Sequence, residues 1–326
     1  MSLKPYIIKM DLLENFINSL YERINKRSEL VLYISDVLSI ERESANRRLN
    51  KKVQFTIQEM GKLSQNLNIS LDNLMKNKHS PALPTLKIKT LISGYSVEDM
   101  ITNIESETKK LKSISMEPIE FGTAFSSMPL EFILPYSNLE KFMFYKWGYF
   151  HIGSNEYDDF SLWKMPERLK KANQQLLRIN TDIKDRIYIW NPVTIWSMVK
   201  EIKYFKSIHA INDQDIIYIK TDLHKMLNDI ENQAKMCKMQ SDNKIEIYIS
   251  FINHGLNFYY FKTENNFHVA FDGYFTSLDC YNNRESVINI QEWIMSLKKV
   301  STLISESGAV ERRLFFEEQH SYVGDI

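Results

Sequence analysis

The chain has 326 residues, and its 41 lysines and arginines balance 41 aspartates and glutamates. This length predicts more than one domain. No stretch approaches the roughly 20 apolar residues of a membrane span, and the N-terminus lacks a signal-peptide pattern, so we expect a cytoplasmic protein with no membrane partner. Cys237 and Cys280 are too few for a disulfide framework, and we expect both to be reduced thiols.

Charge and aromatic content divide the chain at about residue 80. Residues 1–80 hold 13 lysines and arginines against 9 aspartates and glutamates, a net charge of +4, and the remainder carries −4. Only 5 of the 40 aromatic residues lie in this first part. A basic first part suits contact with phosphates, whereas the acidic second part does not. The second part must contain most of the aromatic core.

Hydrophobic periodicity predicts five short helices in the first part of the chain. They cover residues 12–24, 30–38, 42–51, 56–67 and 71–75. Ser35 is small enough to let a second helix cross the 30–38 helix closely, and Ser39 interrupts the pattern. Thr56 and Glu59 have the spacing of a capping box, which predicts the start of the fourth helix with Ile57 on its apolar side. The pattern indicates an all-α first domain.

The third helix, at about Arg42–Lys51, has only Ala45 and Leu49 to point inward. At about 100° per residue, its outward positions are Glu43, Arg47, Asn50 and Lys51, and its flanks carry Ser44, Asn46 and Arg48. Guanidinium, ammonium, amide and hydroxyl groups are the ones that pair with base edges and phosphates. The predicted DNA-binding residues are Arg42, Glu43, Ser44, Asn46, Arg47, Arg48, Asn50, Lys51, Lys52 and Thr56.

From Leu12 to about Met75, these helices resemble the lambda-repressor/Cro-like (XRE-type) family of bacterial regulators. The closing run at 67–74 is similar to the usual end of that domain, and Arg47-Arg48-Leu49 followed by Phe55-Thr56 is similar to one branch of the family. The resemblance implies a helix-turn-helix domain of five helices and a transcriptional regulator that binds double-stranded DNA as a homodimer, with the third helix in the major groove.

Two positions depart from the family pattern. Ser39 stands where the family has a glycine between the two motif helices, and Lys51 or Lys52 stands where a glycine usually follows the recognition helix. The first departure leaves the register of the recognition helix open by one residue. A competing hypothesis is a protein-interaction adaptor or antitoxin-like protein, because charged helical faces are often only solvated surface. Salt dependence distinguishes the two, since phosphate neutralisation makes DNA affinity fall steeply with salt.

The proposed organisation is a helix-turn-helix domain at 1–78, a linker at 79–88 that contains Pro81 and Pro84, and a second domain at 89–326. The second domain is predicted to be α+β. Helices are expected at about 137–150, 195–205, 213–236 and 284–304, and strands at 245–251, 257–262 and 267–278. The alternating strands predict an antiparallel β-meander flanked by helices. PAS- and GAF-like sensor domains have similar elements, which is an analogy of fold alone.

No pattern predicts an enzyme, a metal site or a cofactor. The 9 glycines are too scattered for nucleotide-binding loops, and the 7 histidines never fall at metal-ligand spacing with one another or with the cysteines. The acidic pairs at 158–159 and 213–215 fit a loop and a helix start. We therefore expect no catalytic residues.

The aromatic helix Ser137–Phe150 begins with a predicted capping box of Ser137 and Glu140. Core packing is its simplest role. Aromatic residues also line ligand pockets and dimer surfaces, so this helix is a candidate wall for a small-molecule effector site, the effector itself being unknown. It is also a candidate dimer interface, as is the helix Arg284–Ile304.

Overall fold

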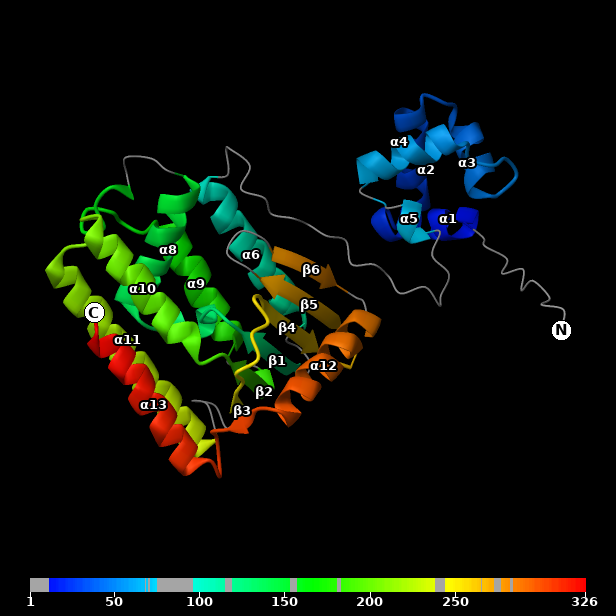
Figure 1. The fold of residues 1–326 in the computed structure, drawn as a ribbon. Helices are drawn as coiled ribbons and strands as arrows, with labels where there is room; N and C mark the ends of the chain where they lie inside the picture. The colour runs from blue at the N-terminus through cyan, green and yellow to red at the C-terminus, as the bar shows by residue number, and fades with distance from the viewer. Residues whose placement is uncertain are drawn as a thin grey trace, which may run out of the picture. The chain divides into compact units, whose positions relative to one another are not determined.

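The computed structural model describes residues 12–67, 69, 71–74, 96–114, 119–152, 157–180, 183–237, 244–264, 266–272, 277–281 and 284–326. The chain divides into two compact units, Met1–Leu83 and Pro84–Ile326 (Figure 1). Each unit has its own hydrophobic core. The linker predicted at 79–88 lies outside the described residues.

The first unit consists of short helices around a small core. They are α1 (Leu12–Arg23), α2 (Arg27–Leu38), α3 (Arg42–Leu49), α4 (Ile57–Leu67) and α5 (Leu71–Leu74). The predicted apolar stripes form the core, where Phe16, Leu20, Ile34 and Leu63 are fully buried. The ring of Phe16 meets the edge of Phe55 at a centroid distance of 5.5 Å. The five helices follow the predicted order, with α3 ending two residues earlier than expected.

The second unit is built on a mixed 7-stranded sheet of order β6-β5-β4-β1-β2-β3-β7. Its strands are β1 (Ile119–Phe125), β2 (Ile183–Trp190), β3 (Lys244–Ile249), β4 (Asn257–Lys262), β5 (Phe267–Asp272), β6 (Ser277–Tyr281) and β7 (Thr302–Leu303). β1, β2 and β3 run parallel to one another. β4, β5 and β6 form an antiparallel meander on the other side of β1.

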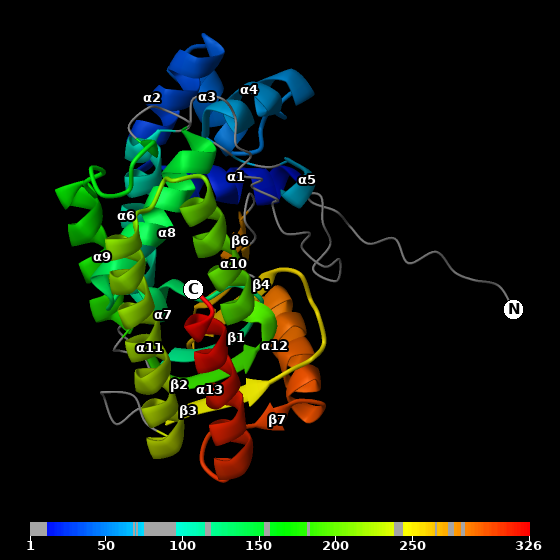
Figure 2. The same cartoon turned by 60° about the vertical axis from the view of Figure 1, so that its left-hand side comes forward.

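Helices cover both faces of this sheet. They are α6 (Val97–Ile114), α7 (Leu130–Ile133), α8 (Ser137–His151), α9 (Glu167–Asn180), α10 (Val193–Ser207), α11 (Asp213–Met236), α12 (Arg284–Lys299) and α13 (Ala309–Gly324). The larger core lies under α8, α10, α11 and α13, whereas α12 covers the opposite face. α13 lies beside α10 and α11 (Figures 1 and 2). None of the described helices is long and apolar enough to cross a membrane.

The sheet is larger than predicted and includes parallel strands that were not predicted from the sequence. The meander of β4, β5 and β6 is present, but β3 pairs in parallel with β2, and β1 and β2 were not predicted. β1 is buried along almost its whole length, so its sequence lacks the alternation that identifies a half-buried strand. The second unit is therefore a mixed helix and sheet domain with parallel strands, and the sensor-domain analogy loses the antiparallel sheet on which it rested.

Two helix predictions also need correction. The helix expected at Arg284–Ile304 ends at Lys299, and the chain continues through β7 into α13, which was not predicted. The expected capping box at the start of α8 is replaced by a contact between helices. Asp222 of α11 accepts hydrogen bonds from the backbone amide and side chain of Asn138, at 2.8 and 3.0 Å. Glu140 instead accepts a hydrogen bond from Asn173 of α9, at 2.8 Å.

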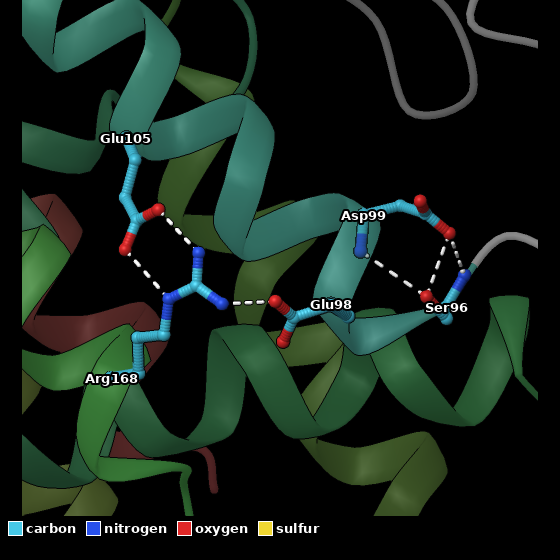
Figure 3. Close-up of polar contacts among 5 residues, drawn as sticks. All are labelled: Ser96, Glu98, Asp99, Glu105 and Arg168. Atoms are coloured by element: carbon cyan, nitrogen blue, oxygen red, sulfur yellow. Dashed lines mark hydrogen bonds and ion pairs between the residues drawn. The ribbon is translucent and has the colours of Figure 1, made fainter.

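α6 is joined to α9 by a cluster of charged side chains (Figure 3). Ser96 and Asp99 form a capping box, with Ser96 N to Asp99 Oδ2 at 2.9 Å and Asp99 N to Ser96 Oγ at 3.2 Å. Arg168 of α9 forms ion pairs with Glu98 and, through two nitrogens at 2.6 and 2.8 Å, with Glu105. Hydrogen bonds from Arg168 lower the pKa of Glu105. These pairs are exposed, so each adds little to stability.

Candidate nucleic-acid interface

The turn between α2 and α3 fixes where α3 begins. Ser39 adopts the left-handed conformation, with φ 54° and ψ 47°. Ile40 N donates to Ser35 O at 3.0 Å, and Ser35 Oγ donates to Ile40 O at 2.5 Å. The first of these bonds and the left-handed residue before it are those of a Schellman motif, in which glycine is the preferred residue. The register that the sequence left open therefore has α3 starting at Arg42.

The end of α3 repeats this geometry. Lys51 has a φ of 60°, and Lys52 N donates to Arg47 O at 2.9 Å. Ser39 and Lys51 therefore both have the backbone conformation that glycine favours, although each carries a side chain.

One flank of α3 is attached to α4 through Arg48. The Arg48 guanidinium donates two hydrogen bonds to Glu59, Nε to Oε2 at 3.1 Å and Nη2 to Oε1 at 2.7 Å. Glu59 Oε2 also accepts from Thr56 N at 2.9 Å, and Thr56 Oγ1 accepts from Glu59 N at 3.2 Å, which confirms the predicted capping box. Partial burial tends to raise the pKa of Glu59, but the hydrogen bonds from Arg48 and Thr56 lower it below its ordinary value.

Arg48 and Thr56 were both predicted to bind DNA. In the structure both contact Glu59. Only 15% of the Arg48 side chain is exposed, and the Thr56 hydroxyl caps α4. Ile57, predicted to lie on the apolar side of α4, is instead 85% exposed. A helical projection gives the direction of each Cβ but does not show that a long side chain from a neighbouring helix ends beside it.

The opposite flank of α3 is attached to α2 through Arg27, which was not predicted as a site residue. Arg27 Nη2 lies 2.6 Å from Asn50 Oδ1 and 3.5 Å from Asn46 Oδ1, and Nη1 lies 3.3 Å from the hydroxyl of Tyr21. Arg27 is the first residue of α2, far from both asparagines in the sequence. No spacing rule identifies such a contact, because it depends on how α2 crosses α3.

The outward face of α3 remains available. Arg42, Glu43 and Arg47 are exposed, and among the residues that the structure describes none of these side chains has a hydrogen bond or ion pair. Lys51 is also exposed, and its Nζ lies 3.3 Å from Glu14 Oε1. Of the remaining predicted residues, Asn50 and Lys52 are exposed and Ser44 and Asn46 are half-buried. The structure therefore brings basic, acidic and amide groups together on one short helix and the turn that follows it.

The second unit offers no comparable surface among its sequence-predicted candidates. Within the described ranges, no group of three or more His, Cys, Asp or Glu side chains is arranged to hold a metal ion. Asp213 and Asp215 lie in the first turn of α11, where Asn212 Oδ1 accepts from Asp215 N at 2.8 Å, as expected for a helix start. Asp159 lies in a loop and accepts from Ser161 N at 2.7 Å.

The aromatic helix α8 packs into the core. Leu139, Phe142 and Tyr145 are buried, and the ring of Phe205 lies 5.7 Å from Phe142 and 5.8 Å from Tyr145. α12 likewise uses its apolar residues against the sheet: Val287, Ile294 and Leu297 are buried. Most of the apolar surface of the two predicted dimer helices is therefore already covered within the second unit.

Neither a protein-family model, nor a curated protein, nor a solved structure matches the chain. The functional argument therefore rests on the geometry of α3 and the contacts on its flanks.

Proposed function

We propose that the chain is a sequence-specific DNA-binding transcriptional regulator that acts in the cytoplasm as a homodimer. The observation that carries this proposal is the state of α3. It is a short helix with two buried residues, Ala45 and Leu49, and an outward face on which Glu43 and Arg47 are exposed and have no partner among the described residues. A helix of this composition adds little to a core, so its polar face is its main contribution.

The contacts on the two flanks support this role. Arg48 joins α3 to α4, and Arg27 joins α3 to α2. Side chains that are fixed before binding lose less conformational entropy when they meet a partner, which favours affinity. A helix held on both flanks with its outward face free is the arrangement that reading of base edges requires.

Pairing of two copies is part of the proposal, because one such helix contacts too few base pairs to select a site. We assign the contact to α10 rather than to α8 or α12. Val193, Trp196 and Tyr204 lie on α10 at successive separations of three and eight residues and are 54%, 45% and 48% exposed. An exposed apolar stripe on a helix is typical of an interaction surface.

A second copy of this chain is the partner that we assign to α10. α10 carries Lys200, Lys203 and Lys206, of which Lys206 already pairs with Asp213, and the neighbouring α13 carries Glu311, Glu317 and Glu318 together with Arg313, beside exposed Val310 and Leu314. In a two-fold symmetric pair, α10 of each copy can face α13 of the other, so both contacts form together. The second unit then supplies the pairing that the first unit requires.

Fluorescence anisotropy of the full chain with a labelled duplex tests the DNA-binding proposal. We expect affinity to fall by at least tenfold between about 50 and 200 mM salt, because phosphate contacts release counterions. Arg47→Ala should weaken binding, whereas Lys62→Ala removes a positive charge from the exposed side of α4 and serves as the matched control. Absence of binding at low salt overturns the proposal. An affinity that does not change with salt concentration favours the adaptor hypothesis.

Light scattering of the full chain at tens of micromolar tests the pairing. The wild-type protein should be a dimer and Trp196→Glu a monomer, because a carboxylate would be buried in the contact. Leu162→Glu is the control, since Leu162 is 77% exposed outside α10 and α13. A monomeric wild-type protein, or a dimer that tolerates Trp196→Glu, contradicts the proposed surface.

A further inference from the structure

We propose that α3 reads G·C base pairs: its arginine and asparagine side chains donate to guanine, and Glu43 accepts from cytosine. This inference rests on the proposed DNA-binding function and adds the class of base that the helix recognises. It follows from which polar groups on α3 are engaged and which are free.

Arg27 determines how the amide of Asn50 is turned. A guanidinium group only donates hydrogen bonds, so the Asn50 atom that lies 2.6 Å from Arg27 Nη2 must be the oxygen Oδ1. Oδ1 is thereby held on the flank that faces α2, and the Nδ2 hydrogens are turned away from it. Asn46 is oriented in the same sense, with Oδ1 at 3.5 Å from the same nitrogen.

This orientation disfavours adenine. An asparagine reads adenine with both ends of its amide, accepting from N6 and donating to N7. With Oδ1 held by Arg27, Asn50 offers its donor end only. Arg42 and Arg47 can also only donate, and both are exposed without a partner among the described residues. The face is therefore rich in donors.

Guanine matches a donor-rich face best, because it presents two adjacent acceptors, N7 and O6, in the major groove. Arg47 lies at the centre of the outward face and is the side chain that we assign to this contact. Glu43, one turn earlier, is the exposed acceptor of the same face. A carboxylate accepts from N4 of cytosine, whereas N7 of adenine lies beside its N6 donor and would repel the negative charge.

Selection of bound duplexes from a random-sequence library, with the full-length protein, provides the site for the test. We expect guanine at one or more positions of each recovered half-site. Replacing that guanine by 7-deazaguanine removes the N7 acceptor and leaves base pairing unchanged. Wild-type affinity should then fall by less than the roughly 5- to 150-fold that a whole bidentate contact is worth, because O6 still accepts. In Arg47→Ala the same replacement should have no further effect.

Arg27 provides a second readout. Arg27→Met keeps the aliphatic stem of the side chain but releases Oδ1 of Asn50, so the penalty for adenine at one guanine position should shrink. Lys62→Ala should leave both base preferences unchanged. Half-sites made only of A·T pairs, or a 7-deazaguanine site bound as tightly as the parent site, overturn the inference while DNA binding stands. A library that shows no enrichment overturns the proposed function itself.

Discussion

The two units differ in the space around the glycines inside their helices and strands. Gly61 of α4 has no atom within 4 Å of the place where a Cβ would be built. Gly122 of β1 and Gly148 of α8 are each covered by a tyrosine ring, Tyr260 and Tyr157. The first unit is a small bundle held by turns and side-chain pairs, whereas the second is a close-packed sheet in which aromatic rings fill the space that glycines leave.

The largest expected effect comes from replacing glycine by alanine, which should change the free energy of unfolding with opposite signs in the two units. Gly122→Ala should destabilise the second unit by about 2–3 kcal/mol, because the added methyl group would overlap the buried ring of Tyr260. Gly61→Ala should stabilise the first unit by about 0.5–1 kcal/mol through helix propensity. All 5 tryptophans lie after residue 84, so tryptophan fluorescence in urea reports on the second unit alone. Amide hydrogen exchange of peptides from 12–74 reports on the first. Equal signs would remove the distinction between the units.

The pair of Arg48 and Glu59 tests whether the first unit depends on side-chain contacts as well as on its core. Arg48→Ala should destabilise it by about 2 kcal/mol, since two hydrogen bonds between charged groups are lost at a partly buried position. Arg48→Lys keeps the charge but not the two-pronged geometry, and should recover less than half of the loss. Faster amide exchange in α3 and α4, with an unchanged tryptophan transition, is the expected result. Unchanged exchange would assign the stability of the unit to its core alone.

The elements of the first unit could be predicted from the sequence more completely than those of the second. Each helix of the first unit has its signals within a turn or two, as with Thr56 and Glu59, so the elements could be predicted in order. In the second unit, α11 was predicted with its observed bounds for the same reason. The alternation at Lys244–Ile249 correctly indicated a strand, but alternation does not show which partner a strand has. Pairing of β3 with β2 depends on contacts distant in sequence.

The candidate interface was predictable only in part. Inward Ala45 and Leu49 and outward Glu43 and Arg47 follow from helical periodicity, and the structure agrees with all four. Helical periodicity does not predict which residues the long side chains on the flanks contact. Arg48 reaches α4, and Arg27 reaches α3 from α2, since the position of a guanidinium depends on the packing of the neighbouring helix.

The turn at Ser39 provides a smaller test of backbone control in the first unit. The left-handed conformation costs a residue with a side chain about 1–2 kcal/mol, whereas glycine adopts it freely. Glycine also makes the unfolded chain more flexible, so Ser39→Gly should give a net stabilisation of about 0.5–1 kcal/mol. Ser39→Ala is the control and should give no gain. Amide exchange in α2 and α3 measures the difference, and a destabilised Ser39→Gly protein would show that the Ser39 side chain, not the backbone, sets this turn.

The smallest expected effect separates the units by pH. Burial lowers the pKa of His224, His254 and His320 in the second unit below the ordinary value of 6.5. His224 also faces the His320 ring, with the two Nδ1 atoms 2.7 Å apart, and Lys220 disfavours its charged form further. At these three histidines the folded unit thus binds fewer protons than the unfolded chain. Their contribution to stability is complete above pH 6.5 and declines as the pH falls below that value, whereas Glu131 and Glu140, whose pKa burial raises, act in the opposite sense.

The first unit should respond in a different pH range. Its described residues include no histidine, and its perturbed carboxylate, Glu59, has a pKa below the ordinary value of 4.5, so this contribution is lost only in more acidic solution. Lowering the pH from about 7.5 to about 5.5 should therefore shift the urea midpoint of tryptophan fluorescence further downward in the wild-type protein than in His224→Gln, and leave exchange in 12–74 unchanged. The variant differs because one desolvated imidazole no longer has to accept a proton. If both units respond equally between these pH values, proton uptake by the buried histidines is not what separates them, and the division by pH fails even if the division by volume holds.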